Sequence, residues 1–398
     1  MNVKVCLLTT SFPRSKEDHS GIFVSRLCRA LVSSGIRIDV VAPGHEATPD
    51  SELIDGCHVY RFSYFFPQKW QRLAYGPGGI PGNLSRSPWR LIQLPFFLLT
   101  FLFKAVKVAK GSDIIHAQWI PSGIIAWVVS VYRGIPFVVT LRGSDALYAR
   151  RSGFLSAASL WILRRAAAVT TVNKELRAWL IIGGLPQDRV VFIRNGVDLE
   201  PERRDGEASP FYRILFVGNF IPIKGIRYLI EAFSTVIRSE SNLRLTLIGE
   251  GEERPALERQ IKENGMNAFV EFVGMQPPEE IQTWMSRSDC LVLPSLSEGT
   301  PNVVLEAMAC GIPVVASDLP GIREVVRDGA TGLLTKPQDP EDLAEKLLKL
   351  VRDRSLSEEM GKKGREAIGE MGLDWEAVAG RYREVYERVC AGSRESSI

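Results

Sequence analysis

Two glutamates, Glu298 and Glu306, stand eight positions apart in the stretch SEGTPNVVLEAMACGIPVVAS. Glu298 follows CLVLPS, an apolar run typical of a buried strand, and Glu306 shares a helix face with Asn302, four residues earlier. Backbone amides and the dipole at a helix start favour phosphate, while carboxylates accept hydrogen bonds from hydroxyls. The pattern suits a ligand with both groups, such as a nucleotide or nucleotide-sugar. Taken alone, the two glutamates are also consistent with a helix that they merely cap and solubilise.

A lysine and two glycines come at the ends of neighbouring predicted strands. Gly218 follows YRILFV, Gly249 follows LRLTLI, and Lys224 stands just before a predicted helix. A lysine beside a helix N-terminus is suited to a diphosphate, and glycine lets bare backbone approach a ligand. The histidines and cysteines show no metal-ligand spacing, so we expect no metal and assign the neutralisation of phosphate charge to Lys224 and helix amides.

The elements that would position these residues form two series, in which short β-branched runs alternate with helical patterns. Continuously apolar strands between helices predict parallel sheets covered on both faces. We therefore predict an α/β chain with two Rossmann-like, doubly wound domains that face each other across a cleft. The predicted domains are residues 1–200 and 211–375, joined by a polar linker at 198–210, and a last helix at 376–398 could pack back on the first domain. The expected strands are residues 3–10, 36–43, 113–119, 136–141 and 167–173, then 212–218, 243–251, 270–274, 290–295, 312–317 and 332–335.

Composition and charge describe a globular chain with two different halves. The 398 residues are 45% hydrophobic and 24% charged. Residues 1–200 carry a net charge of +11 and the remainder −8, so the first half could meet phosphates or an anionic membrane. We expect no nucleic-acid binding, because no aromatic platform is interleaved with the basic residues. The six cysteines form no CxxC pair and the N-terminus does not resemble a signal peptide, which favours a cytoplasmic protein.

The most hydrophobic stretch, residues 91–103, has two interpretations. Its sequence, LIQLPFFLLTFLF, is too short to span a bilayer and contains Pro95. Arg90 precedes it, and three lysines follow, at positions 104, 107 and 110. One interpretation is a helix buried in the first domain. The other is a helix that lies on an anionic membrane, which would make the protein peripheral on the inner face of that membrane.

Glu298 and Glu306 also form the E-x7-E motif of retaining glycosyltransferases. Together with VGNFIPIKG, LIGEGEE, VEFVG and GIREVVRDGATGLL, the motif resembles glycosyltransferase family 4, most strongly over residues 211–375. The first domain resembles the family more loosely, in SFPRSKEDHSGIFVSRLCRAL, HAQWIPSG, VVTLRGSD and FIRNGVD. The resemblance implies the GT-B fold, with the sugar donor held mainly by the second domain.

The resemblance also implies roles for individual residues. Lys224 would bind the donor diphosphate, Glu306 the ribose hydroxyls, and Glu298 the sugar near the reacting centre. Retaining members are thought to react through a short-lived oxocarbenium-like ion pair, with the acceptor attacking from the leaving-group face and the leaving phosphate able to take its proton. The other donor contacts implied are Gly21, Gly218, Asn219, Gly249, Met275, Gly299, Thr300, Asn302 and Val303.

Two positions depart from the family pattern. Asn219 stands where the family usually has arginine, so Lys224 would neutralise more of the phosphate charge, with help from Arg142. Arg142 stands where the family often has histidine, and arginine cannot act as a general base near neutral pH. His116, in HAQW, follows a predicted strand and faces the cleft by position, and it is either a site residue or a structural histidine. The expected catalytic group is Glu298, Lys224, Arg142 and His116.

These patterns predict a retaining, metal-independent glycosyltransferase of polysaccharide biosynthesis. Its donor would be a UDP- or GDP-linked sugar, without a further cofactor, and its acceptor a glycan or a lipid-linked molecule. Two alternatives on the same fold stay open. A nucleotide-sugar epimerase would need acid and base side chains around the sugar, and a non-catalytic sugar-nucleotide sensor would account for Asn219 and Arg142.

Overall fold

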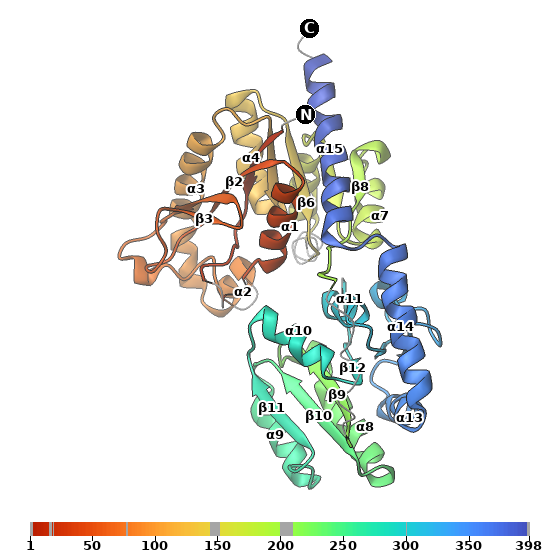
Figure 1. The fold of residues 1–398 in the computed structure, drawn as a ribbon. Helices are drawn as coiled ribbons and strands as arrows, with labels where there is room; N and C mark the ends of the chain where they lie inside the picture. Colours follow the sequence, from red (N-terminus) through yellow and green to blue (C-terminus); the bar gives the residue numbers. More distant parts are fainter. Residues whose placement is uncertain are drawn as a thin grey trace. The chain divides into compact units, whose positions relative to one another are not determined.

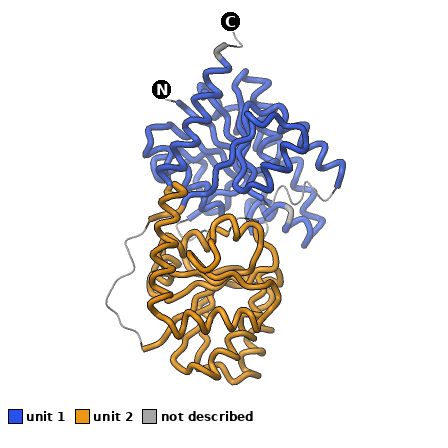
Figure 2. The backbone as a smooth tube through the Cα atoms, turned by 90° about the vertical axis from the view of Figure 1, so that its right-hand side faces the viewer, with its two compact units in different colours: residues 1–196, 375–398 blue, residues 197–374 orange. Residues whose placement is uncertain are grey.

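The computed structural model describes residues 3–15, 18, 20–76, 79–143, 152–199, 210–299 and 301–395. The chain forms two compact units, which are coloured separately in Figure 2. Unit 1 consists of Met1–Gly196 and Trp375–Ile398, and unit 2 consists of Val197–Asp374. Most of the predicted linker, residues 200–209, lies outside the described part of the chain.

Unit 1 is built on an eight-stranded sheet of order β3-β4-β2-β1-β5-β6-β7-β8. Neighbouring strands are parallel except β3 and β4, which are antiparallel at one edge. Side chains alternate between two cores: Val5 and Leu7 enter one, and Cys6 and Leu8 enter the other. The strands are β1 (Lys4–Leu8), β2 (Arg37–Pro43), β3 (Ser51–Ile54), β4 (Cys57–Phe62), β5 (Ile114–Gln118), β6 (Phe137–Leu141), β7 (Ala168–Thr171) and β8 (Val190–Phe192).

Helices cover both faces of this sheet (Figure 1). On one face α1 packs against α15, the last helix of the chain, and on the other lie α3, α4, α6 and α7. The helices are α1 (Ile22–Ser33), α2 (Gly79–Arg86), α3 (Leu94–Val108), α4 (Trp119–Arg133), α6 (Gly153–Leu163), α7 (Lys174–Ile182) and α15 (Trp375–Glu395). Short 3-10 turns are η1 (Gln68–Trp70), η2 (Pro88–Gln93) and η3 (Gln187–Arg189).

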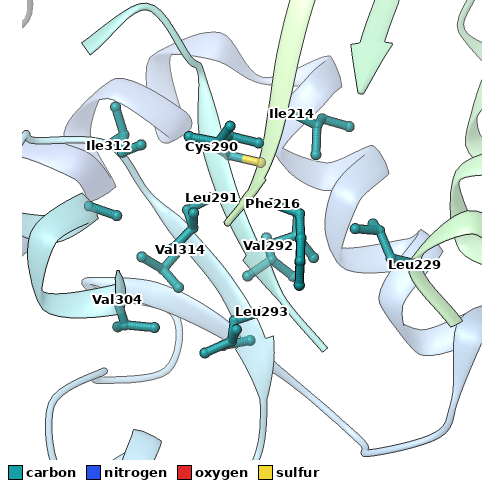
Figure 3. Packing of buried hydrophobic residues seen from close by; sticks show 14 of the residues in the cluster. Ile214, Phe216, Leu229, Cys290, Leu291, Val292, Leu293, Val304, Ile312 and Val314 are labelled. Carbon is teal, nitrogen blue, oxygen red and sulfur yellow. The ribbon is translucent and has the colours of Figure 1, made fainter. Parts of the chain in front are cut away.

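Unit 2 has a six-stranded, wholly parallel sheet of order β11-β10-β9-β12-β13-β14. Figure 3 shows the centre of its core, where β12 lies among apolar side chains from β9, α11 and β13. The strands are β9 (Tyr212–Val217), β10 (Leu243–Ile248), β11 (Val270–Gly274), β12 (Cys290–Leu293), β13 (Val314–Ser317) and β14 (Gly332–Thr335). The helices are α8 (Ile226–Ser239), α9 (Arg254–Glu263), α10 (Pro278–Ser286), α11 (Asn302–Ala309), α12 (Pro320–Arg323), α13 (Pro340–Arg352) and α14 (Arg354–Glu370), and η4 (Pro222–Lys224) precedes α8.

The predicted α/β class with two parallel-sheet domains is confirmed. All six strands expected in the second half are present, and so are the five expected in the first. The sequence analysis missed β3, β4 and β8, which lie toward the edges of the unit 1 sheet. All six cysteines are buried, and none of them forms a disulfide bond.

Candidate functional site

The strand order of unit 2 reverses between β9 and β12, and the predicted donor residues follow these two strands. In open parallel sheets a ligand binds beyond the carboxyl ends of the strands at such a reversal. Gly218 and Asn219 directly follow β9, and Glu298 comes five residues after β12 ends. Lys224 is the last residue of η4, just before α8 begins.

A close contact between two loops positions Lys224. The backbone N–H of Leu296 donates to the carbonyl oxygen of Ile223 at 2.8 Å. Gly225 caps α8 with a φ of 63°, and a Cβ atom at this residue would lie 2.2 Å from the carbonyl oxygen of Pro294. Glycine tolerates both the left-handed backbone and this approach. The Lys-Gly pair in the sequence therefore sets the lysine against the loop that follows β12.

Lys224 and Glu298 form an ion pair at this contact. Nζ of Lys224 lies 2.7 Å from Oε2 of Glu298, and the hydroxyl of Ser295 donates to the same oxygen at 3.3 Å. The two charged side chains are 22% and 14% exposed, so their attraction is screened less than on an open surface. An ammonium group has three N–H donors, so Lys224 can also donate to a phosphate while it holds Glu298.

Helix α11 follows directly after this loop. It begins at Asn302 with Pro301 at the N-cap, and Thr300 lies outside the described residues. Asn302, Val303 and Glu306 are half-buried, which leaves them accessible to a ligand at the helix start. The inward face of the helix is fully buried, at Val304, Leu305, Ala307 and Met308.

The loops after β9, β10 and β11 stack backbone against backbone. The N–H of Gly218 donates to the carbonyl oxygen of Ile248, and that of Gly249 to Gly274, each at 3.0 Å. Gly249 has a φ of 139°, and a Cβ there would lie 1.9 Å from the carbonyl oxygen of Gly218. The packing of these loops therefore explains why residue 249 is glycine, whereas the sequence analysis attributed this glycine to the close approach of a ligand. Met275, next along the chain from Gly274, is 51% exposed.

At the carboxyl edge of the unit 1 sheet, Arg142 directly follows β6 and is half-buried. Its Nε donates to Oε1 of Gln118 at 3.0 Å, and its guanidinium also donates to Oδ1 of Asn195. The guanidinium carbon lies 4.8 Å from the centre of the Phe23 ring. A planar cation held in this way suits a phosphate or a carboxylate.

Gly21 stands at the N-cap of α1, in the loop after β1. Its φ is 70°, and a Cβ atom would lie 2.3 Å from the carbonyl oxygen of Ser11, so the turn itself requires glycine. Arg61, which is 2% exposed, holds the same loop by donating to the carbonyl oxygens of Phe12 and Pro13.

Comparison with known proteins agrees with this geometry. Residues 200–367 match the family described as glycosyl transferases group 1, and residues 20–196 match the glycosyl transferase 4-like domain. An uncharacterised glycosyltransferase of Methanocaldococcus jannaschii is 31% identical over 298 residues, covering 73% of this chain and 81% of that protein. The chain belongs to the group 1 glycosyltransferases.

Solved structures show the same fold for this glycosyltransferase. Sucrose-phosphate synthase from Thermosynechococcus elongatus superposes with a TM-score of 0.79 at 24% identity, over 98% of this chain and all of that one. HepE from Anabaena, solved in complex with UDP and glucose, gives a TM-score of 0.73 at 20% identity, over 97% of this chain and all of that one. The predicted GT-B fold is thereby confirmed.

The groups of this glycosyltransferase that could hold a diphosphate are Lys224 and the N-termini of α8 and α11. Gly299 links Glu298 to α11, and its carbonyl oxygen would lie 2.8 Å from a Cβ at Gly321, so this loop is packed closely on α12. Among the described residues, no group of three or more His, Cys, Asp or Glu side chains is placed to hold a metal ion.

The structure corrects the interpretation of His116. This residue lies inside β5, not after it, and is fully buried. Its Nε2 contacts the Thr140 hydroxyl at 2.7 Å and the Gln118 side-chain nitrogen at 3.2 Å, while Nδ1 contacts the Tyr386 hydroxyl at 2.7 Å. Burial, and secondly the charge of Arg142, lower the pKa of His116 to about 3. A neutral imidazole with no exposed surface is structural, which contradicts the predicted catalytic role.

The hydrogen bonds also fix the proton on this imidazole. Gln118 accepts from Arg142 through its oxygen, so its amide N–H groups face Nε2 of His116. Nε2 must therefore accept, and the ring proton sits on Nδ1, where it is donated to the oxygen of Tyr386. Gln118 thus connects His116 and Arg142, the two predicted residues that unit 1 brings together.

Several residues of the site were missed by the sequence analysis. Ser295, Gln118 and Asn195 each contact a predicted residue, and all three stand within or just beyond a strand end. These three residues could have been identified by treating every polar residue at a predicted strand end as a site candidate. Tyr386, which contacts His116 from 270 positions away, has no such signal.

Proposed function

We propose that this glycosyltransferase moves a sugar from a UDP- or GDP-linked donor to a glycan or lipid-linked acceptor, with retention of configuration and without a metal ion. The observation that carries the proposal is the ion pair of Lys224 and Glu298, 2.7 Å apart beyond the strand reversal of unit 2. It combines a cation suited to phosphate with a carboxylate suited to sugar hydroxyls.

In the proposed reaction the bond between the sugar's anomeric carbon and the leaving phosphate oxygen breaks first. Lys224 and the amides at the start of α8 would neutralise the charge that develops on the diphosphate. The acceptor hydroxyl oxygen then bonds to the anomeric carbon on the face that the diphosphate leaves, and its proton passes to a phosphate oxygen. A protein base is not needed for this step, which is consistent with the structural role of His116.

Glu298 and Glu306 would bind different parts of the donor. Glu298 is anchored through Oε2 by both Lys224 and Ser295, and within the described residues its Oε1 has no partner, so Oε1 can accept from a sugar hydroxyl. Glu306, half-buried on α11, would accept from the ribose. The amides of Asn302 and Val303, at the start of the same helix, would donate to phosphate or sugar oxygens.

The donor class is supported by HepE, which was solved in complex with UDP and glucose, and with UDP-glucose. Arg142 would be an anion-binding group of unit 1, since its guanidinium suits a phosphate or carboxylate of a substrate. As the resemblance to family 4 implies, the donor would also contact the backbone of Gly218, Asn219, Gly249 and Met275.

The proposal is tested by incubating the purified protein with separate radiolabelled UDP- and GDP-sugars, without an acceptor. A transferase should slowly hydrolyse one donor, and proton NMR of the first sugar released should show the donor's anomeric configuration. Interconversion of two nucleotide-sugars would instead show an epimerase, and an unchanged panel would show a sensor.

The metal-free part of the proposal has its own test. EDTA should leave the rate unchanged, because Lys224 and the helix amides supply the positive charge. Strong inhibition by EDTA that magnesium reverses would contradict metal independence but not sugar transfer.

A further inference from the structure

Helix α3 presents apolar side chains on two opposite faces. Its inner face, with Phe97, Phe101 and Ala105, is fully buried, and Phe101 stacks on Phe62 of β4 at 4.7 Å between ring centres. The outer stripe starts at Ile92 of η2 (66% exposed) and continues at helical spacing along α3 with Phe96 (51%), Leu99 (55%) and Phe103 (77%). Figure 1 shows α3 at the outside of unit 1. A helix that is apolar all round normally has an apolar neighbour on every face.

Neighbouring segments extend this stripe into a surface. The Gln93 side chain, just before α3, donates to the carbonyl oxygen of Trp70 at 2.8 Å, which ties η1 to the start of the helix. Phe65 packs edge-on to Phe96, with ring centres 6.0 Å apart. We call this surface the α3 face, and its exposed apolar residues are Phe66, Trp70, Trp89, Leu91, Ile92, Phe96, Leu99 and Phe103.

The charge around the α3 face has one sign. Residues 56–112 contain eight lysines and arginines and no aspartate or glutamate. Five of the eight are exposed, namely Lys69, Arg72, Arg86, Lys107 and Lys110. Lys107 continues the outer stripe of α3 beyond Phe103, and Lys110 follows two residues after the helix ends, so the stripe passes from apolar to basic.

The α3 face does not belong to a helix that crosses a membrane. Among the described residues, Pro88–Val108 is long and apolar enough to span a bilayer by length and composition. However, Phe97, Phe101 and Ala105 belong to the core of unit 1, and a spanning orientation would remove them from it. The helix can therefore contact lipid only with its outer stripe.

We propose that the α3 face docks unit 1 on the surface of an anionic phospholipid bilayer. Tryptophan favours the interface between headgroups and acyl chains, while phenylalanine and leucine insert below it. The basic residues around them would contact the anionic headgroups. The uniform positive charge opposes docking of a second copy of the same face, since the lysines of both copies would meet.

The proposal is tested by sedimentation of the whole protein with vesicles, independently of transferase activity. Binding should be strong to phosphatidylglycerol mixed with phosphatidylcholine, weaker to phosphatidylcholine alone, and reduced but not abolished by high salt. Negligible binding to both vesicles at low salt would overturn the proposal.

Matched variants locate the contact. Leu99→Asp combined with Phe103→Asp should abolish binding, whereas Ile182→Asp, a change at an 86% exposed residue of α7, should not. Lys107→Gln combined with Lys110→Gln should weaken binding roughly 25-fold, at about fivefold per lysine. The same change at Lys262 and Lys336, exposed lysines of unit 2, serves as its control. If Ile182→Asp abolished binding and the α3 variants did not, the assigned surface would be wrong.

Quenching by brominated lipid measures insertion directly. Tryptophan fluorescence should fall on binding to vesicles whose acyl chains carry bromine, because Trp70 and Trp89 are exposed on the α3 face. In the variant Trp70→Phe with Trp89→Phe, most of this quenching should disappear while sedimentation persists. Quenching of equal size in the variant would place other tryptophans at the lipid and would contradict the proposal.

Discussion

The carboxyl edges of the two sheets hold their charged side chains in different ways. In unit 2, Lys224 and Glu298 meet directly across two short loops and stay partly exposed. In unit 1, Arg142 is held by the neutral amides of Gln118 and Asn195, and its neighbour His116 is fully buried against residues of α15. The difference indicates that unit 2 keeps its charged groups accessible, whereas the histidine of unit 1 supports the structure behind an arginine whose guanidinium would suit an anion.

The largest effect that this comparison predicts is on Lys224. In Lys224→Ala the charge on the leaving diphosphate loses its cationic partner, so turnover should fall about 100- to 1000-fold, or about 3–4 kcal/mol. Steady-state kinetics with the identified donor would measure the loss, and circular dichroism would check the fold. Lys262→Ala, at an exposed lysine of α9, should keep full activity. Turnover near the wild-type rate in Lys224→Ala would remove this residue from the mechanism.

The loop contact beneath the ion pair should matter almost as much. Gly225→Ala adds a Cβ 2.2 Å from the Pro294 carbonyl oxygen, and should separate Lys224 from Glu298. Gly265→Ala is a matched control, because Gly265 has a similar φ of 67° but no atom within 4 Å of a Cβ. Both variants should lose about 1–2 kcal/mol to the left-handed backbone. Gly225→Ala should lose about 1–3 kcal/mol more in urea unfolding, together with most of its activity.

Equal stability and activity in the two glycine variants would contradict the view that loop packing positions Lys224. A loss of stability without a loss of activity would limit the contact to a structural role.

Unit 2 was the more predictable of the two regions. Its six strands are short, mainly apolar runs with a glycine or proline at one end, and the residues after them could be identified as site candidates. The ion pair itself could not be predicted, because it depends on Gly225 approaching Pro294, a contact between loops 69 positions apart in the sequence.

Unit 1 was less predictable for two physical reasons. The strands β3 and β8 are short edge strands, and the alternating exposure of β3 gives no continuous apolar run. His116 was misjudged because its partner Tyr386 comes from α15, and no local pattern shows that a distant helix returns to cover a strand. The sequence analysis left open a buried and a membrane-facing position for residues 91–103, and the structure shows a helix with one side buried and the other exposed.

Within unit 2 the two glutamates should respond differently. In the proposed mechanism Glu298 lies near the reacting sugar, so Glu298→Gln should lower kcat about 10- to 100-fold with little change in KM. In the proposed mechanism Glu306 accepts hydrogen bonds from the ribose, which does not change in the reaction. Glu306→Gln should therefore mainly raise the donor KM, by up to about 10-fold. Initial rates over a range of donor concentrations would separate these effects. If both variants altered KM alone, Glu298 would have no part in the chemical step.

The smallest expected effect concerns the pH dependence that His116 gives to unit 1. Its pKa is lowered to about 3 by burial, and an unfolded histidine titrates near 6.5. Below that value the unfolded chain binds a proton that the folded chain excludes, so stability is present at higher pH and is lost as the pH falls. Between about pH 7.5 and about pH 5 this group should remove about 2 kcal/mol from the free energy of unfolding.

The control for this prediction is His116→Gln, which cannot bind the proton. The variant should be less stable at neutral pH, because the hydrogen bonds of the imidazole are lost, but its stability should change less with pH than that of the wild type. Urea unfolding followed by tryptophan fluorescence reports mainly on unit 1, which contains seven of the eight tryptophans. Carboxylates titrate mostly below this range, so the difference between the two proteins isolates the histidine. Parallel pH profiles would mean that His116 is protonated in the folded state, and its assignment as a neutral, structural residue would then be wrong.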